Sequence, residues 1–161
     1  MPSLIRFING LFSGGPYYVR IGRNRLSVRD VAGEGQFDDE PIVALSDDSP
    51  PKVLAIGRAA KNTSARWINP FDHPRIILGD FTVAEALITH SFLVVSRRRH
   101  IRSSPIVVIH PIDMLTGGLS SIERRALMEL AYGAGAREVH IWEGAELSDA
   151  ELINHAYRRA T

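Results

Sequence analysis

An apolar segment, a helix with a marked start and a second apolar segment follow one another between residues 104 and 142. This succession restricts the fold more than any other feature of the chain. The first segment reads SPIVVIH and the last reads REVHIW, and both are typical of buried strands. Between them, Ser120 and Glu123 form the capping box of a helix, and YGAGA supplies the glycine signal of its end. A strand, a helix and a strand in this order predict a right-handed crossover between two parallel strands.

The helix expected between these strands carries apolar residues at helical spacing. We expect its inner face to consist of Ile122, Ala126, Leu127 and Leu130. Downstream, Ser148 and Glu151 repeat the capping-box pattern, so a final helix should begin there and run to about Arg159. Leu147 and Leu152 flank this second box at the spacing of a hydrophobic staple.

The first part of the chain contains short runs in which apolar and polar residues alternate, which indicates strands. We expect these strands at Tyr17–Gly22, Leu26–Val31 and Ile42–Ser46, with a further apolar run at Val53–Ile56. Turn signals lie on both sides of that last run. The early strands should therefore be followed by a small inserted subdomain at about residues 47–80.

A longer helix should follow the insertion, with Thr82 as its N-cap, Glu85 closing a capping box and an end near Val95. The expected order is thus three strands, a helix, a strand, a helix, a strand and a helix. It predicts an α/β fold with a mixed five-stranded sheet and flanking helices. This is the order of a ribonuclease-H-like sheet, which occurs in nucleases, sugar kinases and actin-like ATPases, and by itself it selects no function.

Composition excludes several kinds of site. The chain has 161 residues, 45% of them hydrophobic, which is enough for one domain with a continuous core. Cysteine is absent, which excludes disulfides and thiolate catalysis. The six histidines lack the spacing of metal ligands, so we assign no metal site and expect each histidine to be exposed or half-buried. The formal charge is only +1 and no aromatic residues stand among the arginines, so nucleic acid is not an expected partner.

The N-terminus, residues 1–15, is expected to form an amphipathic helix that precedes a single domain at 16–161. At 100° per residue its apolar side chains fall on one arc, and Gly14, Gly15 and Pro16 end the helix. Two interpretations stay open: the helix docks on its own core, or it lies in the plane of a membrane as an anchor. The apolar arc consists of Leu4, Ile5, Phe7, Ile8, Leu11 and Phe12.

Arginines gather at the turn of the first hairpin. Gly22, Arg23, Asn24 and Arg25 form the turn, and Arg20 stands just before it on the strand. A guanidinium matches the geometry of a phosphate, so the turn is a candidate anion site. The alternative is a solvated hairpin tip whose arginines face water or the carboxylates of Asp and Glu.

A second basic cluster, SRRRHIR, follows the long helix. Its cations offset the dipole at the helix end, and their stems cover apolar surface. The functional alternative is contact with an acidic lipid headgroup or an acidic partner, which would supplement an amphipathic anchor. The basic patch consists of Arg97, Arg98, Arg99 and Arg102.

Six segments, in the same order, resemble the MreB family of bacterial actin homologues, which determine rod shape. They are RFINGLFSGG, DEPIVAL, VLAIGRAAK, GDFTVAEALITH, SSPIVVIHP and ERRALMELAYGAGAREVHIWE. The resemblance covers about residues 5 to 146 and matches the first large domain of the family only. It implies a ribonuclease-H-like, actin-like ATPase domain consisting of a single lobe, with the N-terminal segment where some members carry an amphipathic membrane helix.

The resemblance also implies a role for the arginine turn. In the family this hairpin contains an aspartate, a glycine and small or polar residues, because a nucleotide phosphate and its magnesium lie against it. Here Arg20 occupies the aspartate position, Gly22 remains, and Arg23, Asn24 and Arg25 crowd the turn. A guanidinium cannot hold magnesium. We therefore expect a degenerate phosphate loop and no cofactor, with ATP and magnesium bound only if another chain supplies a second lobe.

Two carboxylates follow the strands of the expected crossover. Glu143 matches a glutamate of the family and is interpreted as a residual cleft carboxylate, and Asp113 ends the preceding strand. Carboxylates at these positions are also where a metal-dependent nuclease of this fold would place them. Such an enzyme needs an acid on the first strand as well, where this chain has Arg20, which argues against a nuclease.

The resulting functional hypothesis is a truncated, non-catalytic MreB-like cytoskeletal protein without ATPase activity of its own. We expect it in the cytoplasm, peripheral to the inner face of the membrane, acting by membrane and protein contact in cell-shape or cell-wall assembly. Its expected partner is a full-length MreB or another cell-shape protein. The alternative hypothesis is half of an ATP-binding actin-like ATPase that another chain completes.

Overall fold

The computed structural model describes residues 15–98, 103–113 and 116–160. Within these residues a five-stranded mixed sheet forms the centre, in the order β3-β2-β1-β7-β8. Strands β1, β7 and β8 run parallel, and β2 and β3 pair antiparallel beside them. The bounds of these strands are β1 Tyr17–Ile21, β2 Leu26–Asp30, β3 Gln36–Asp39, β7 Ile106–Pro111 and β8 Glu138–Ile141.

The strand, helix and strand that the sequence predicts are confirmed. Strands β7 and β8 pair in parallel, with Val107 opposite Val139, and α3, Ser121–Gly133, connects them. Ser120 and Glu123 form both hydrogen bonds of the capping box. The helix ends before Gly135, which has the positive φ of 103° that glycine tolerates best.

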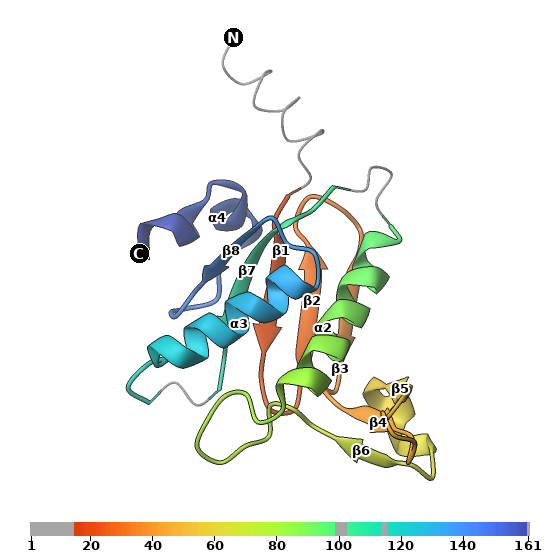
Figure 1. Cartoon of the computed structure of the whole chain (residues 1–161). Coiled ribbons are helices and arrows are strands. Elements are labelled where there is room, and N and C mark those ends of the chain that lie inside the picture. The colour runs from red at the N-terminus through yellow and green to blue at the C-terminus, as the bar shows by residue number, and fades with distance from the viewer. Residues whose placement is uncertain (1–14, 99–102, 114–115, 161) are drawn as a thin grey trace.

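Two helices cover one face of the sheet and a short C-terminal unit covers the other (Figure 1). Helices α2, Phe81–Ser96, and α3 pack on the face that carries Tyr17, Val19 and Ile21. Because side chains alternate along a strand, Tyr18 and Arg20 lie on the opposite face. There Tyr18 packs with a smaller apolar cluster that includes residues of α4, Asp149–Ile153, and of a following 3₁₀ helix, Ala156–Ala160.

The third strand of the main sheet is not the one expected. Ile42–Ser46 was predicted for that place, but the structure puts β3, Gln36–Asp39, there. This segment reads QFDD and is exposed at every second residue, so it lacks the apolar signal by which strands are recognised. It forms the edge of the sheet, where one row of backbone groups needs no partner.

The predicted strand at Ile42–Ser46 instead becomes the middle of a second, smaller sheet. This sheet has the order β5-β4-β6, with β4 Val43–Leu45, β5 Val53–Ile56 and β6 Arg66–Ile68, all paired antiparallel. A 3₁₀ helix, Gly57–Asn62, joins β5 to the segment before β6. Val43 and Ala44 are fully buried, which explains their strand-like sequence without placing them in the main sheet.

The start of α2 also differs from the expectation. Asp80, not Thr82, is the N-cap, and its carboxylate accepts a hydrogen bond of 3.0 Å from the backbone N–H of Val83. An aspartate is at least as good an N-cap as a threonine, and it begins the helix two residues earlier. Glu85 consequently lies within the helix, with its side chain near Gly133 of α3.

The inner face of α3 is rotated from the predicted one. Leu127, Leu130 and Ala131 are buried, whereas Ile122 is 79% exposed and Ala126 is half-buried. At 100° per residue, Ile122 points roughly 130° away from the centre of the buried stripe. The apolar side chain of Ile122 therefore stands in solvent in the first turn of the helix.

The C-terminal helix is shorter than predicted. Its capping box of Ser148 and Glu151 is confirmed, and Leu147 and Leu152 are both buried as a staple requires. However, α4 ends at Ile153, because His155 adopts a left-handed φ of 57°, which an α-helix of L-residues does not continue through. The predicted N-terminal helix, residues 1–15, lies outside the described residues except for Gly15. Among the residues described, no helix is long and apolar enough to cross a bilayer.

Candidate functional site

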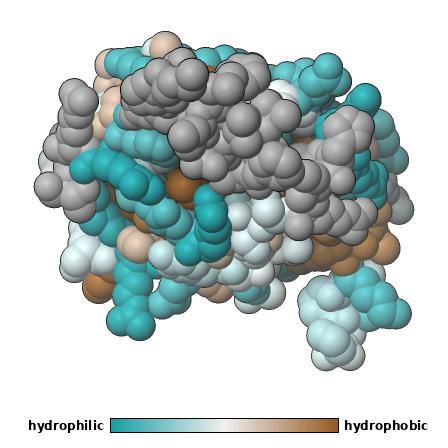
Figure 2. Space-filling view, turned by 90° about the horizontal axis from the view of Figure 1, so that it is seen from above, coloured by the Kyte–Doolittle hydropathy of each residue, from teal (hydrophilic) through white to brown (hydrophobic). Residues whose placement is uncertain are grey.

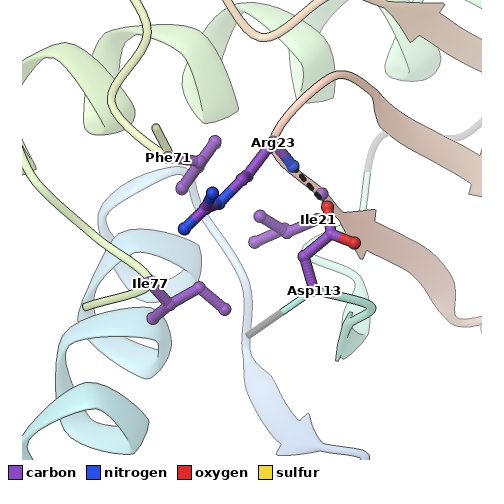
Figure 3. A pocket seen from close by; sticks show the side chains of 6 residues that line it. Ile21, Arg23, Phe71, Ile77 and Asp113 are labelled. Atoms are coloured by element: carbon purple, nitrogen blue, oxygen red, sulfur yellow. Dashed lines mark hydrogen bonds between the residues drawn. The ribbon is translucent and has the colours of Figure 1, made fainter. Parts of the chain in front are cut away.

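The candidate site lies at the end of the sheet where β1, β7 and β8 finish. The β1–β2 turn follows β1, Asp113 follows β7, and Glu143 follows β8. The carboxyl ends of parallel strands form the edge where α/β sheets bind ligands. Figure 3 shows the turn, with Asp113 beside it and Phe71 and Ile77 across a small hollow.

The turn itself is closed by a hydrogen bond of 2.9 Å from the backbone N–H of Gly22 to the carbonyl of Arg25. The next N–H, that of Arg23, donates to Oδ2 of Asp113 at 2.7 Å. A Cβ atom at Gly22 would lie 2.8 Å from the same oxygen. The carboxylate of Asp113 therefore rests on the backbone of the turn, at a position that only a residue without a side chain leaves open.

The side chain of Arg23 turns into the hollow instead of facing solvent (Figure 3). Its Nη2 donates to the carbonyl oxygen of His73 at 3.2 Å, while Nδ2 of Asn69 donates to the Arg23 carbonyl at 2.6 Å. Both partners come from the segment between β6 and α2. The hollow is small, with a cavity volume of only about 10 Å³, which is far below the size of common ligand pockets.

The other two arginines of this region face carboxylates. Nη1 of Arg20 lies 2.8 Å from Oε1 of Glu146, in the segment between β8 and α4. Arg25 makes a bidentate pair with Asp38 of β3, at 2.7 and 2.5 Å. The hydrogen bond from the Arg25 guanidinium holds the pKa of the Asp38 carboxyl below its usual value. Asn24 is exposed at the tip.

A buried polar chain lies on the same face of the sheet as Arg20. The Tyr18 hydroxyl lies 2.6 Å from Nδ1 of His110, and Nε2 of His110 lies 3.0 Å from the carbonyl of Gly144. The backbone N–H of Leu147 donates to the Tyr18 oxygen at 3.2 Å. Burial lowers the pKa of His110 and raises that of Tyr18. Because His110 is only 4% exposed, the expectation that every histidine is exposed or half-buried is wrong here.

Glu143 is held by α3 and the segment before it. Its carboxylate forms an ion pair with Arg124 and accepts a hydrogen bond of 3.1 Å from the backbone N–H of Leu119. Asp113 and Glu143 thus have separate partners. Across the described part of the chain, no three His, Asp or Glu side chains are grouped as a metal site would require.

The basic patch and the apolar N-terminal arc are described only in part. Arg97 and Arg98 directly follow α2 and are exposed, while Arg99, Arg102 and residues 4–12 lie outside the described residues. Figure 2 looks down on the end of the molecule where α2 finishes, and hydrophilic residues cover much of the coloured surface there. This end is opposite the β1–β2 turn (Figure 1).

Sequence comparison supports the resemblance found in the motifs. The family model described as MreB/Mbl protein matches residues 21–149. The cell shape-determining protein MreB of Escherichia coli K12 is 36% identical over 124 residues, which cover 70% of this chain and 34% of the relative. The MreB of Pasteurella multocida is 31% identical over 150 residues, covering 87% of this chain and 40% of the relative. The chain therefore spans little more than a third of the length of these relatives.

Solved structures show the same fold. MreB5 of Spiroplasma citri bound to ADP superposes with a TM-score of 0.60 at 20% identity, covering 80% of this chain and 38% of that one. The same protein bound to AMPPNP gives a TM-score of 0.59 at 21% identity. The central sheet with its flanking helices is thus the actin-like fold of MreB. Since the family model matches most of the chain, this protein belongs to the MreB/Mbl family.

Proposed function

We propose that this protein is a non-catalytic member of the MreB family that acts by contact in cell-shape or cell-wall assembly. Its contacts are the inner face of the cytoplasmic membrane and a full-length MreB or another cell-shape protein. The observation that carries the proposal is Arg20, a cation at the end of β1, paired with Glu146. A carboxylate there could serve the water shell of magnesium, and a guanidinium cannot.

The remaining residues of the turn also do not fit a magnesium nucleotide. Arg23 and Arg25 stand where small side chains would let phosphates approach the backbone. The Arg23 N–H is already used by Asp113, whose negative charge opposes that of a phosphate. MreB5 of Spiroplasma citri has been solved with ADP and with AMPPNP, so the family fold accommodates nucleotides, but this turn has different chemistry.

Membrane contact is supported by the positions of the described residues that adjoin the apolar N-terminal segment and the basic patch. Gly15 lies against Ala32 in the β2–β3 turn, and Gly35 of the same turn lies against Val95 in the last turn of α2. Gly15 and the end of α2, the described residues next to these two segments, therefore lie at the same end of the domain. An anionic bilayer at this end would meet an apolar arc and a cluster of arginines together, the two signals that stable peripheral binding needs.

The enzymatic part of the proposal is tested by measuring phosphate release from ATP with magnesium. We expect no release by the purified chain, and no increase over full-length MreB alone when the two are mixed. Release by the isolated chain would refute the proposal. An increase that rises with the amount of chain added to MreB would instead support a nucleotide site completed by a second chain.

The membrane part is tested by co-sedimentation with anionic vesicles. We expect the intact chain to pellet with the vesicles and the Leu4→Glu, Ile8→Glu variant to remain in solution. Arg97→Glu, Arg98→Glu should weaken pelleting and increase its sensitivity to salt. The matched control is Arg66→Glu, Arg75→Glu, which reverses two exposed charges outside this end of the domain. Equal pelleting of all variants would rule out the anchor.

A further inference from the structure

We propose that the carboxylate of Asp113 is an internal anion that occupies the oxyanion-binding position of the β1–β2 turn. The turn can then take a phosphate only when Asp113 is removed. This inference rests on the proposal that the domain works without bound nucleotide, and it identifies what fills the position instead. Once Asp113 is removed, the ligand expected at this position is a small oxyanion such as phosphate.

The first support is the placement of Asp113 by the sheet. Strands β1 and β7 are paired up to Ile21 and Pro111, and the N–H of Ile112 donates to the Ile21 carbonyl at 2.8 Å. This bond extends the parallel pairing by one residue beyond the strand. The following residue, Asp113, is thereby brought to the backbone of the turn, 90 residues away in sequence.

The second support is the contact itself. The Arg23 N–H donates to Asp113 Oδ2 at 2.7 Å, within the range of a charge-assisted hydrogen bond. Exposed backbone N–H groups in turns are common anion sites in proteins. Gly22 completes the position, because any Cβ there would lie 2.8 Å from the same carboxylate oxygen. The N–H of Arg23, beside Gly22, is thus occupied by the negatively charged carboxylate of Asp113 from the same chain.

The third support is the guanidinium of Arg23. It lines the same hollow as Asp113 (Figure 3), and its Nη2 donates to the carbonyl oxygen of His73. The backbone N–H and the guanidinium of Arg23 are two donors at one hollow beside Gly22, and such donors suit an oxyanion. A phosphate that entered here would meet the negative charge of Asp113 at short range, and the repulsion excludes it.

The test follows the amide resonances of Gly22 and Arg23 in the 15N-labelled full chain during titration with inorganic phosphate at constant ionic strength. We expect no saturable shift in the unsubstituted chain. Asp113→Ala should show saturable shifts at both amides, with at least a tenfold gain in apparent affinity. Adding Arg23→Gln to this variant should abolish the gain. Glu34→Gln is the matched control: it removes the same charge from an exposed residue of the β2–β3 turn and should gain nothing.

Two results would overturn the inference. One is saturable phosphate binding at these amides in the unsubstituted chain, and the other is no gain in Asp113→Ala. ATP without magnesium serves as a second ligand. A gain for ATP but none for phosphate would place binding outside the turn and would count against the inference. Phosphate release from ATP by the unsubstituted chain bears on the proposed function, so the two claims fail separately.

A second measurement does not depend on the folding of one variant. Gly22→Ala should lower the midpoint of thermal unfolding, by roughly 2–4 °C for each kcal/mol lost, because the new methyl group lies 2.8 Å from the Asp113 carboxylate and 3.0 Å from the Ile112 side chain. In a protein that already carries Asp113→Ala or Asp113→Asn, Gly22→Ala should lower the midpoint of thermal unfolding by less. Additive shifts in both backgrounds would show that Asp113 does not occupy the position over Gly22.

Discussion

The hydroxyl oxygen of Tyr18 lies 2.6 Å from Nδ1 of His110, and this contact joins β1 to β7 on the face of the sheet that the C-terminal unit covers. The directions of the hydrogen bonds follow from the neighbours. The carbonyl of Gly144 can only accept, so Nε2 of His110 carries the proton and Nδ1 accepts from the Tyr18 O–H. The Tyr18 oxygen in turn accepts from the N–H of Leu147. In this row of hydrogen bonds, every polar atom of Tyr18 and His110 thus has a partner only while His110 is neutral.

The neutral state of His110 predicts a loss of stability in mild acid. Burial lowers the folded-state pKa of His110 below its unfolded value of about 6.5. The contribution of neutral His110 to the free energy of unfolding is therefore complete above about pH 6.5. It is lost as the pH falls toward the folded pKa, because the unfolded chain binds the proton first. Denaturant unfolding at pH 8, 6.5 and 5.5 should show this loss. His110→Gln should show a smaller loss, and equal pH dependence of the two proteins would contradict the assignment.

Tyr18→Phe should destabilise the protein by about 1–3 kcal/mol, because it leaves Nδ1 of His110 and the N–H of Leu147 without their partner in a buried site. Urea unfolding at pH 8 measures the change. Tyr132→Phe is the matched control, since Tyr132 is 47% exposed on α3 and the same atom is removed there. A similar effect of both substitutions would show that the buried hydrogen bonds add nothing.

Glu123 should stabilise the protein more than a helix cap alone. Its carboxylate accepts from Ser120 and also from the backbone N–H of Ile77 at 3.1 Å, which ties α3 to the segment before α2. These hydrogen bonds, those from Ser120 first, lower the pKa of Glu123. The contribution is present above the unfolded pKa and is lost as the pH falls through the lower folded value.

We therefore expect Glu123→Ala to cost about 1–2 kcal/mol at pH 7 and less at pH 3. Glu129→Ala is the control, because Glu129 lies on the exposed side of the same helix and pairs only with Arg125 in the hydrogen bonds described for it. Its removal should change stability by less than about 0.5 kcal/mol. A pH-independent cost of Glu123→Ala would contradict the role of its charge.

The rotated inner face of α3 is tested by two alanine substitutions. Leu127→Ala should cost about 2–5 kcal/mol, since this side chain is fully buried between α3 and the sheet. Ile122→Ala should cost less than about 0.5 kcal/mol, because 79% of its surface is exposed. Comparable costs in urea unfolding would show that Ile122 is packed after all, for instance against a partner molecule.

Local patterns in the sequence predicted a large part of the fold. The capping boxes of α3 and α4, the hairpin of β1 and β2 and the crossover from β7 to β8 depend on residues within one element or its direct neighbours. Such signals hold where no neighbouring residue competes with them, whereas Asp80 replaced the expected capping box of Thr82 and Glu85. The edge strand β3 was missed because a strand with one exposed side and four mostly polar residues has no apolar periodicity to detect.

The candidate site could be predicted only in part. The sequence indicated which residues form the turn, and it identified Arg20 as a cation in an unusual place. The alternative in which the arginines face carboxylates holds for Arg20 and Arg25. The sequence did not indicate that Arg23 turns inward toward Phe71. Spacing within a hairpin says nothing about which distant carboxylate each arginine meets.

By itself, the sequence determined the resemblance to the family, the order of most elements and the presence of a cation, Arg20, just before the first turn. The tertiary structure alone decided that Asp113 rests on Gly22 and Arg23, and that His110 is buried beneath Tyr18. Both contacts join residues about ninety positions apart. The parallel register of β1 and β7 creates them, and that register arises from packing of the whole sheet and not from any local pattern.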